Sequence, residues 1–181
     1  DYTTLFDAST FPTTFSAEVK NYRLEDHIAD ASRHATAGRN SAFALGACAQ
    51  AWKDAGLDGA KVDLDGVGIY LGSGEGSLDF EAYTRAALGA WQEGEGSIDT
   101  VTWARLAQAG MDVMRELEQE PNMPLSHLAI LTGARGPAFN CLTACAASTQ
   151  AIGEAMEILR RGDAEVMIAG GAHSMIHPLG V

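Results

Sequence analysis

The sequence predicts an α/β fold, in which helices pack on the faces of a sheet. Residues 67–71 and 165–169 are short apolar runs with the length and composition of buried strands. Longer runs at about 41–55 and 146–161 place apolar residues at helical spacing, the second with Ile152, Ala155, Met156 and Leu159. Because strands and helices alternate along the chain, we expect a single sheet covered by helices.

The first elements are bounded by residues that start or stop regular structure. Asn40 and Ser41 are both suitable caps for the helix that runs to about residue 55, and Gly56 ends it. A turn near 63–66 leads into the strand at 67–71, and a glycine-rich segment follows at 72–76. That segment contains Glu75 and lacks the Gly-Lys-Ser/Thr ending of a phosphate-binding loop, so we interpret it as a structural turn.

The middle of the chain is compatible with helices at 78–90 and 98–117, the second capped by Asp99 or Thr100. The candidate core positions of the second helix are Val101, Leu106, Met111 and Met114. Pro121 and Pro124 interrupt this pattern, and a shorter helix at 126–132 ends at Gly133.

The last part of the chain contains glycines at positions where a helix and a strand are expected to end. Gly162 suits the left-handed residue that follows a helix, here the one at 146–161. A turn at Gly170-Gly171 is expected to close the strand at 165–169.

Composition excludes several classes of protein. The chain has 181 residues, 46% of them hydrophobic, and a mean hydropathy of −0.03, which predicts one globular domain over residues 1–181. No apolar run is long enough to cross a bilayer, and the residues after Asp1 do not form a signal peptide, so we expect a cytoplasmic protein without a membrane partner. A net charge of −12 excludes a nucleic-acid-binding surface, because phosphates would be repelled.

The three cysteines have different expected roles. Their number and spacing give neither a full set of disulfides nor a zinc pattern, which indicates a reducing compartment. Cys48 lies on an apolar helical stripe and is expected to pack in the core. Cys141 precedes the helix at 146–161 and is expected to lie near the sheet.

Cys145 is the strongest candidate for chemistry. It immediately precedes the helix at 146–161, where unpaired N–H groups and the helix dipole favour a thiolate. The thiolate is the form that attacks a carbonyl carbon, so the position suits covalent catalysis. The residues alone leave open a second interpretation, in which Cys145 is a small buried hydrophobe.

Four segments resemble the β-ketoacyl-acyl-carrier-protein synthases, in particular the elongating ketosynthases of the thiolase superfamily. They are GARGP at 133–137, TACA at 143–146, RGDAEVMIAGGA at 161–172 and PLGV at 178–181. The resemblance implies a thiolase-like fold, a mixed sheet with helices on both faces. It covers only the N-terminal half, the first of two pseudo-repeated halves, and lacks the opening strand of that half.

The resemblance also implies an activity, which is decarboxylative Claisen condensation of an acyl thioester with malonyl-acyl-carrier protein in fatty-acid or polyketide synthesis. Cys145 would carry the acyl group, and its backbone N–H would donate to the oxyanion. No metal or organic cofactor is implied. The implied partners are acyl-carrier protein, acyl and malonyl thioesters, and a second copy of the chain that pairs through residues 139–142.

Carrier-protein docking would need local positive charge, because both molecules would be acidic. That patch is either outside these residues or formed by a cluster of the available cations, Arg33, Arg39, Lys53, Arg135, Arg160 and Arg161.

The two catalytic histidines of the resembled family belong to its second half, so we expect them to be missing here. His173 and His177 have i, i+4 spacing, but they follow Gly170-Gly171 and are interpreted as surface or packing residues. His27 and His127 are expected to be structural, and no third ligand for zinc is evident.

There are three alternatives to a catalytic ketosynthase. Degradative thiolases commonly place glycine after the nucleophile, whereas Ala146 follows Cys145 here. A chain-length-factor subunit would lack the cysteine. A noncatalytic interaction module or partner subunit with the same fold stays open.

Overall fold

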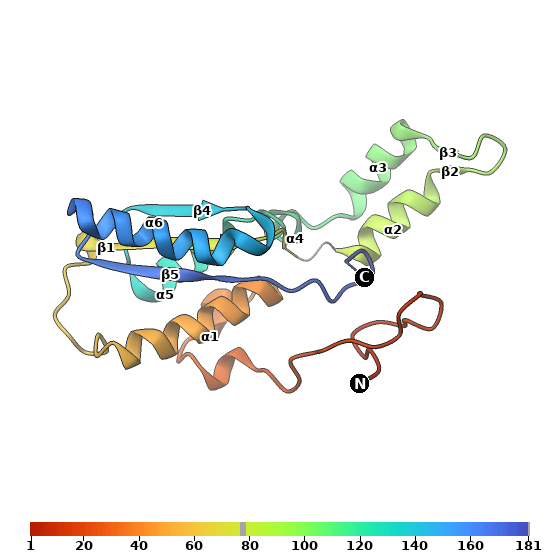
Figure 1. Ribbon diagram of the computed structural model, residues 1–181. Coiled ribbons are helices and arrows are strands. Elements are labelled where there is room, and N and C mark those ends of the chain that lie inside the picture. The colour runs from red at the N-terminus through yellow and green to blue at the C-terminus, as the bar shows by residue number, and fades with distance from the viewer. Residues whose placement is uncertain (77–78, 181) are drawn as a thin grey trace. The chain divides into compact units, whose positions relative to one another are not determined.

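The computed structural model describes residues 1–76 and 79–180 (Figure 1). The chain divides into two compact units. The larger contains residues 19–76 and 120–174, and the smaller contains the described parts of 1–18, 77–119 and 175–181. The assignment of the whole chain to one domain stays a prediction.

A three-stranded sheet forms the centre of the larger unit, in the order β4-β1-β5. The strands are β1 (Val67–Ser73), β4 (Ala138–Cys141) and β5 (Val166–Ala172), and both pairings are parallel. In register, Ile69 lies opposite Ala138 on one side and Ile168 on the other. The strands predicted at 67–71 and 165–169 are confirmed. Among the described residues, antiparallel pairing occurs in a separate two-stranded ribbon of the smaller unit and in one isolated bridge near the N-terminus.

The expected turn at Gly170-Gly171 is wrong. Strand β5 continues through both glycines, which pair with Leu71 and Gly72 of β1. Glycines inside a strand often mark a close approach by other backbone, and Gly171 lies directly beneath Ser148.

Helices cover both faces of this sheet, as predicted (Figure 1). Helices α1 (Arg39–Asp54) and α5 (Met123–Thr132) lie on one face, and α6 (Ala147–Arg161) lies on the other. Successive side chains of β1 point to opposite faces of the sheet, so alternate residues pack against the two helix layers. Ile69 and Leu71 join Leu45 and Leu128 in the main core, whereas Tyr70 packs with the residues beneath α6.

The glycines predicted to end two helices are confirmed, whereas the predicted caps of α1 are not. Gly133 and Gly162 follow α5 and α6 with φ values of 75°, as expected. The caps predicted for α1 are wrong, because Gly38 caps it and Asn40 is buried in its first turn. The Asn40 amide instead donates to the Glu75 carbonyl at 2.9 Å.

The start predicted at residue 126 for the next helix is also wrong, because Pro124 is part of that helix. This residue lies in the first turn of α5, which begins at Met123 rather than at 126. A helix tolerates proline there, since the first N–H groups have no partner within the helix.

The smaller unit contains α2 (Phe80–Gly89), the ribbon of β2 (Trp91–Gln92) and β3 (Ser97–Ile98), α3 (Thr100–Gly110) and α4 (Val113–Leu117). The predicted start of the first helix at residue 78 lies outside the described residues. The ribbon was not predicted from the sequence.

The single helix predicted at 98–117 is wrong. Met111 has extended backbone, and the Asp112 carboxylate accepts from the N–H groups of Met114 and Arg115, which starts α4. The Asp99 cap of α3 is confirmed. The expected core positions are not, since Val101, Leu106 and Met114 are exposed.

The lead-in at 1–38 is largely irregular, as expected, with an isolated bridge between Tyr2 and Phe15. Two short 3₁₀ turns follow, at Leu24–Asp26 and Ala31–His34. Within the described part of the chain, no helix is both long and apolar enough to cross a membrane.

A histidine pair joins the second of these turns to α5. His34 and His127 are both buried, and their Nδ1 atoms lie 2.9 Å apart, so one ring donates to the other. The structural role expected for His127 is consistent with this contact. Burial, together with His127 and Arg33, lowers the pKa of His34, and Asp30 opposes the shift.

Acidification is expected to destabilise the larger unit through His34. The unfolded chain protonates this ring near pH 6.5, whereas the folded chain resists protonation until lower pH, so the unfolded state binds more protons in between. The free energy of unfolding should therefore fall below pH 6.5, by at most about 1.4 kcal/mol per pH unit for this group. Urea melts at several pH values should show a shallower fall for His34→Gln; an unchanged slope would contradict the assignment.

Candidate active site

Cys145 lies at the carboxyl end of the sheet, in the turn that joins β4 to α6. The chain leaves β4 at Cys141, forms a 3₁₀ turn at Ala144–Ala146 and enters α6 at Ala147. The Cys145 side chain is exposed. The predicted position just before a helix is confirmed, and the interpretation of Cys145 as a buried hydrophobe is not.

The backbone is strained immediately before the cysteine. Ala144 has a φ of 48°, in the left-handed region that residues with a side chain rarely adopt. This conformation costs roughly 1–2 kcal/mol for an ordinary residue. Such strain persists only where the surrounding structure holds it, and the contacts at the start of α6 provide that support.

Helix α6 approaches the sheet closely because its inner face is small. Its buried residues are Ala147, Ala151, Ala155 and Ile158. Of the four apolar residues that predicted this helix, only Ala155 is buried, whereas Ile152, Met156 and Leu159 are exposed. Leucine and methionine would hold the helix away from the strands, so alanine is the residue type that fits the contact.

Two glycines lie under the first turn of α6. Gly72 of β1 and Gly171 of β5 are partners in the ladder. A Cβ atom at Gly72 would come within 2.6 Å of the Ser148 backbone nitrogen, and one at Gly171 would lie 2.8 Å from the Ser148 Cβ. The Cys141 thiol donates to the Ala147 carbonyl at 3.2 Å and so fastens the same turn to β4.

An amide network fixes the end of β4, where the turn to Cys145 begins. The Asn140 Nδ2 lies 2.5 Å from the Ser73 Oγ and 3.1 Å from the carbonyl oxygens of Leu71 and Pro121. The Ser73 hydroxyl also donates to the Pro121 carbonyl. Neither Asn140 nor Ser73 was singled out from the sequence, because only the tertiary structure brings them together.

The other two cysteines are buried. Cys48 belongs to the main core, as predicted, and burial raises the pKa of its thiol to about 11. Cys141, predicted to lie near the sheet, is the last residue of β4, and it packs with Ala147 and Ala151.

Iodoacetamide should therefore alkylate Cys145 much faster than Cys48. At pH 8 only about one Cys48 thiol in a thousand would be ionised, and its burial blocks the reagent. Timed alkylation followed by peptide mass spectrometry measures both rates. Equal, slow labelling of the two cysteines in the folded chain would contradict the exposed position of Cys145.

Two further histidines and three of the candidate docking cations have local contacts. The His173 ring packs against Gly74, and the His177 N–H donates to the Met175 carbonyl at 3.0 Å. Arg135 pairs with Asp65, Arg160 with Glu157 and Arg161 with Asp163, all on the surface. Among the described residues, no three His, Cys, Asp or Glu side chains are grouped to hold a metal ion.

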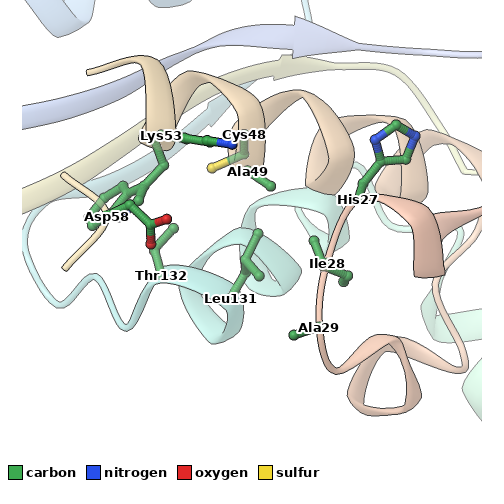
Figure 2. A pocket seen from close by; sticks show the side chains of 10 residues that line it. His27, Ile28, Ala29, Cys48, Ala49, Lys53, Asp58, Leu131 and Thr132 are labelled. Carbon is green, nitrogen blue, oxygen red and sulfur yellow. The ribbon is translucent and has the colours of Figure 1, made fainter. Parts of the chain in front are cut away.

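A separate pocket of about 380 Å³ lies between α1, α5 and residues 27–29 (Figure 2). Ile28, Cys48 and Leu131 supply apolar lining, and Lys53 and Asp58 bring opposite charges. Cys145 is not among its lining residues, and α1 and α5 cover the sheet face opposite α6. The pocket is therefore separate from the candidate active site.

The larger unit has a parallel sheet between helix layers and a cysteine turn ahead of the helix on one face, and comparison with solved structures identifies this as the thiolase-like fold of ketosynthases. Solved structures show the likeness. One is a type II polyketide ketosynthase in complex with its acyl-carrier protein and bound to a hexaketide, with a TM-score of 0.70 and 25% identity over 88% of this chain and 42% of that one. A β-ketoacyl synthase from Burkholderia phymatum STM815 gives a TM-score of 0.64 at 24% identity, over 90% of this chain and 37% of that chain.

The chain belongs to the family described as "Beta-ketoacyl synthase, N-terminal domain", whose model matches residues 5–181. It is 32% identical over 176 residues to 3-oxoacyl-[acyl-carrier-protein] synthase 2 of Staphylococcus aureus, covering 97% of this chain and 40% of the relative. The enzyme of the same name from Vibrio harveyi is 30% identical over 178 residues, covering 97% and 39%. The chain thus spans about two fifths of the length of these relatives.

Proposed function

We propose that this chain is the nucleophile-bearing part of a ketosynthase and that Cys145 carries the growing acyl group. The observation that supports this most is the exposed Cys145 thiol in a strained turn directly before α6, within a chain of the β-ketoacyl synthase family. Neither Cys48 nor Cys141 offers an exposed thiol.

The proposed reaction has two stages. In the first, the Cys145 thiolate attacks the carbonyl carbon of an acyl thioester, and the carrier thiolate leaves and takes up a proton. The Cys145 N–H would donate to the oxyanion that forms on that carbonyl. In the second, malonyl-carrier protein loses carbon dioxide, and the resulting carbanion attacks the acyl-cysteine and expels the Cys145 thiolate.

The partners of the complete protein are also proposals. A relative in the structural comparison was solved with its acyl-carrier protein, which supports a carrier protein as donor. Strand β4 is at an edge of the described sheet, and Phe139 and Leu142 are each about half exposed, which supports a second copy pairing there. The histidines that assist decarboxylation are proposed to lie outside residues 1–181.

The test compares condensation by residues 1–181 with condensation by the longest natural form of the protein. Both are incubated with an acyl thioester and isotopically labelled malonyl-carrier protein, and the labelled 3-oxoacyl product is counted. We expect product from the longer form and none from residues 1–181. Efficient condensation by the 181 residues would overturn the placement of the histidines, and failure of the longer form with every acyl donor would favour a noncatalytic interaction module.

A further inference from the structure

The start of α6 packs directly on the backbone of two glycines in the sheet, Gly72 and Gly171, with no space for a side chain between them. At Gly72 an added Cβ would be 2.6 Å from the Ser148 nitrogen, and at Gly171 it would be 2.8 Å from the Ser148 Cβ and 2.7 Å from the Gly72 carbonyl oxygen of β1. Real Cβ contacts essentially never fall below 3.0 Å. An added methyl at either glycine would therefore force backbone to move.

The atoms in the way at Gly72 are backbone of the helix start, at Ala147 and Ser148, and those at Gly171 include the Ser148 side chain. Of the elements that meet here, the helix start is the part least held. Strand β1 is the central strand, and Gly72 is paired with Cys141 on one side and Gly171 on the other. Helix α6 contacts the sheet through one face only and leaves Ile152, Met156 and Leu159 exposed on the other. A displacement of the helix start by roughly 1 Å restores ordinary van der Waals distance between it and the added Cβ, and it would carry the turn that contains Cys145 with it.

We propose that Gly72 and Gly171 are positioning residues, which set where the Cys145 thiol stands relative to the donors that stabilise the oxyanion. The inference rests on the acyl-transfer function proposed above. Acyl transfer depends on this geometry, and a misplacement of about 1 Å can reduce such a rate about 100-fold. Alkylation by iodoacetamide needs only an exposed thiolate, so it is far less sensitive to the same displacement.

The test measures both reactions of Cys145 in the longest natural form of the protein, as wild type, Gly72→Ala and Gly171→Ala. A matched control is Gly68→Ala on the same strand, where the Cβ would be 2.7 Å from the Pro137 carbonyl and 2.5 Å from the Met167 sulfur. Gly68 lies four residues from Gly72, about 13 Å along the strand. A second control is Gly153→Ala within α6, where an added Cβ meets nothing within 4 Å.

The expected result is a 10- to 100-fold loss of acyl transfer in Gly72→Ala and Gly171→Ala, with alkylation within about twofold of wild type. Gly68→Ala should lose thermal stability but keep the wild-type ratio of acyl transfer to alkylation. Gly153→Ala should keep both the wild-type stability and the wild-type ratio. A wild-type ratio in folded Gly72→Ala, or the same loss in Gly68→Ala, would overturn the positioning role. If wild-type Cys145 accepts no acyl group, the proposed function fails instead.

Discussion

Replacement of Cys145 by alanine is expected to abolish acyl transfer and to leave the fold intact. The loss should be on the order of 10³-fold or more, because the covalent intermediate cannot form without the nucleophile. The side chain is exposed and lies outside both buried clusters, so its removal creates no cavity. Transfer from acyl-carrier protein, measured as acyl-protein by intact mass, gives the rate.

The control for this variant is Cys48→Ala, which removes a thiol from the same chain. Cys48 is buried in the main core, so the free energy of unfolding should fall while acyl transfer per folded molecule persists. Acyl transfer that survives in Cys145→Ala but is lost in Cys48→Ala would reverse the assignment of the nucleophile.

Replacement of Leu45 by alanine should have the largest effect on stability. Leu45 is fully buried between α1 and the sheet, in the cluster that contains Ile69 and Leu128. Deletion of a buried leucine side chain costs about 2–5 kcal/mol, a large part of the 5–15 kcal/mol that stabilises a typical domain. Urea unfolding followed by circular dichroism measures the change.

Leu88→Ala is the matched control, since Leu88 is also helical but 71% exposed. Its effect on the free energy of unfolding should stay within about 0.5 kcal/mol. Equal costs for the two variants would show that Leu45 does not belong to the core described here.

Features with a local cause were predictable from the sequence. The strand at 67–71 follows from an apolar run between turns, and Gly133 and Gly162 end helices because glycine readily adopts positive φ. The position of Cys145 ahead of α6 was predictable because the helical spacing of apolar residues begins directly after it.

Features with a tertiary cause were not predictable. Gly170 and Gly171 are typical turn residues, yet pairing with β1 keeps them in a strand. The first turn of α6 approaches the sheet closely because of Gly72 and Gly171, which lie 75 and 24 residues from Ala147 in the sequence. The Asn140 network likewise joins residues from three separate segments.

The central claim is that the exposed thiol of Cys145 accepts an acyl group, and peptide mapping tests it most directly. The protein is incubated with an acyl-carrier-protein thioester, digested at acidic pH and sequenced by tandem mass spectrometry. We predict that the mass of the acyl group is found on Cys145 and is released by hydroxylamine, as a thioester should be. An acyl group found on Cys48 or Cys141, or on no cysteine of the longest natural form, would contradict the account.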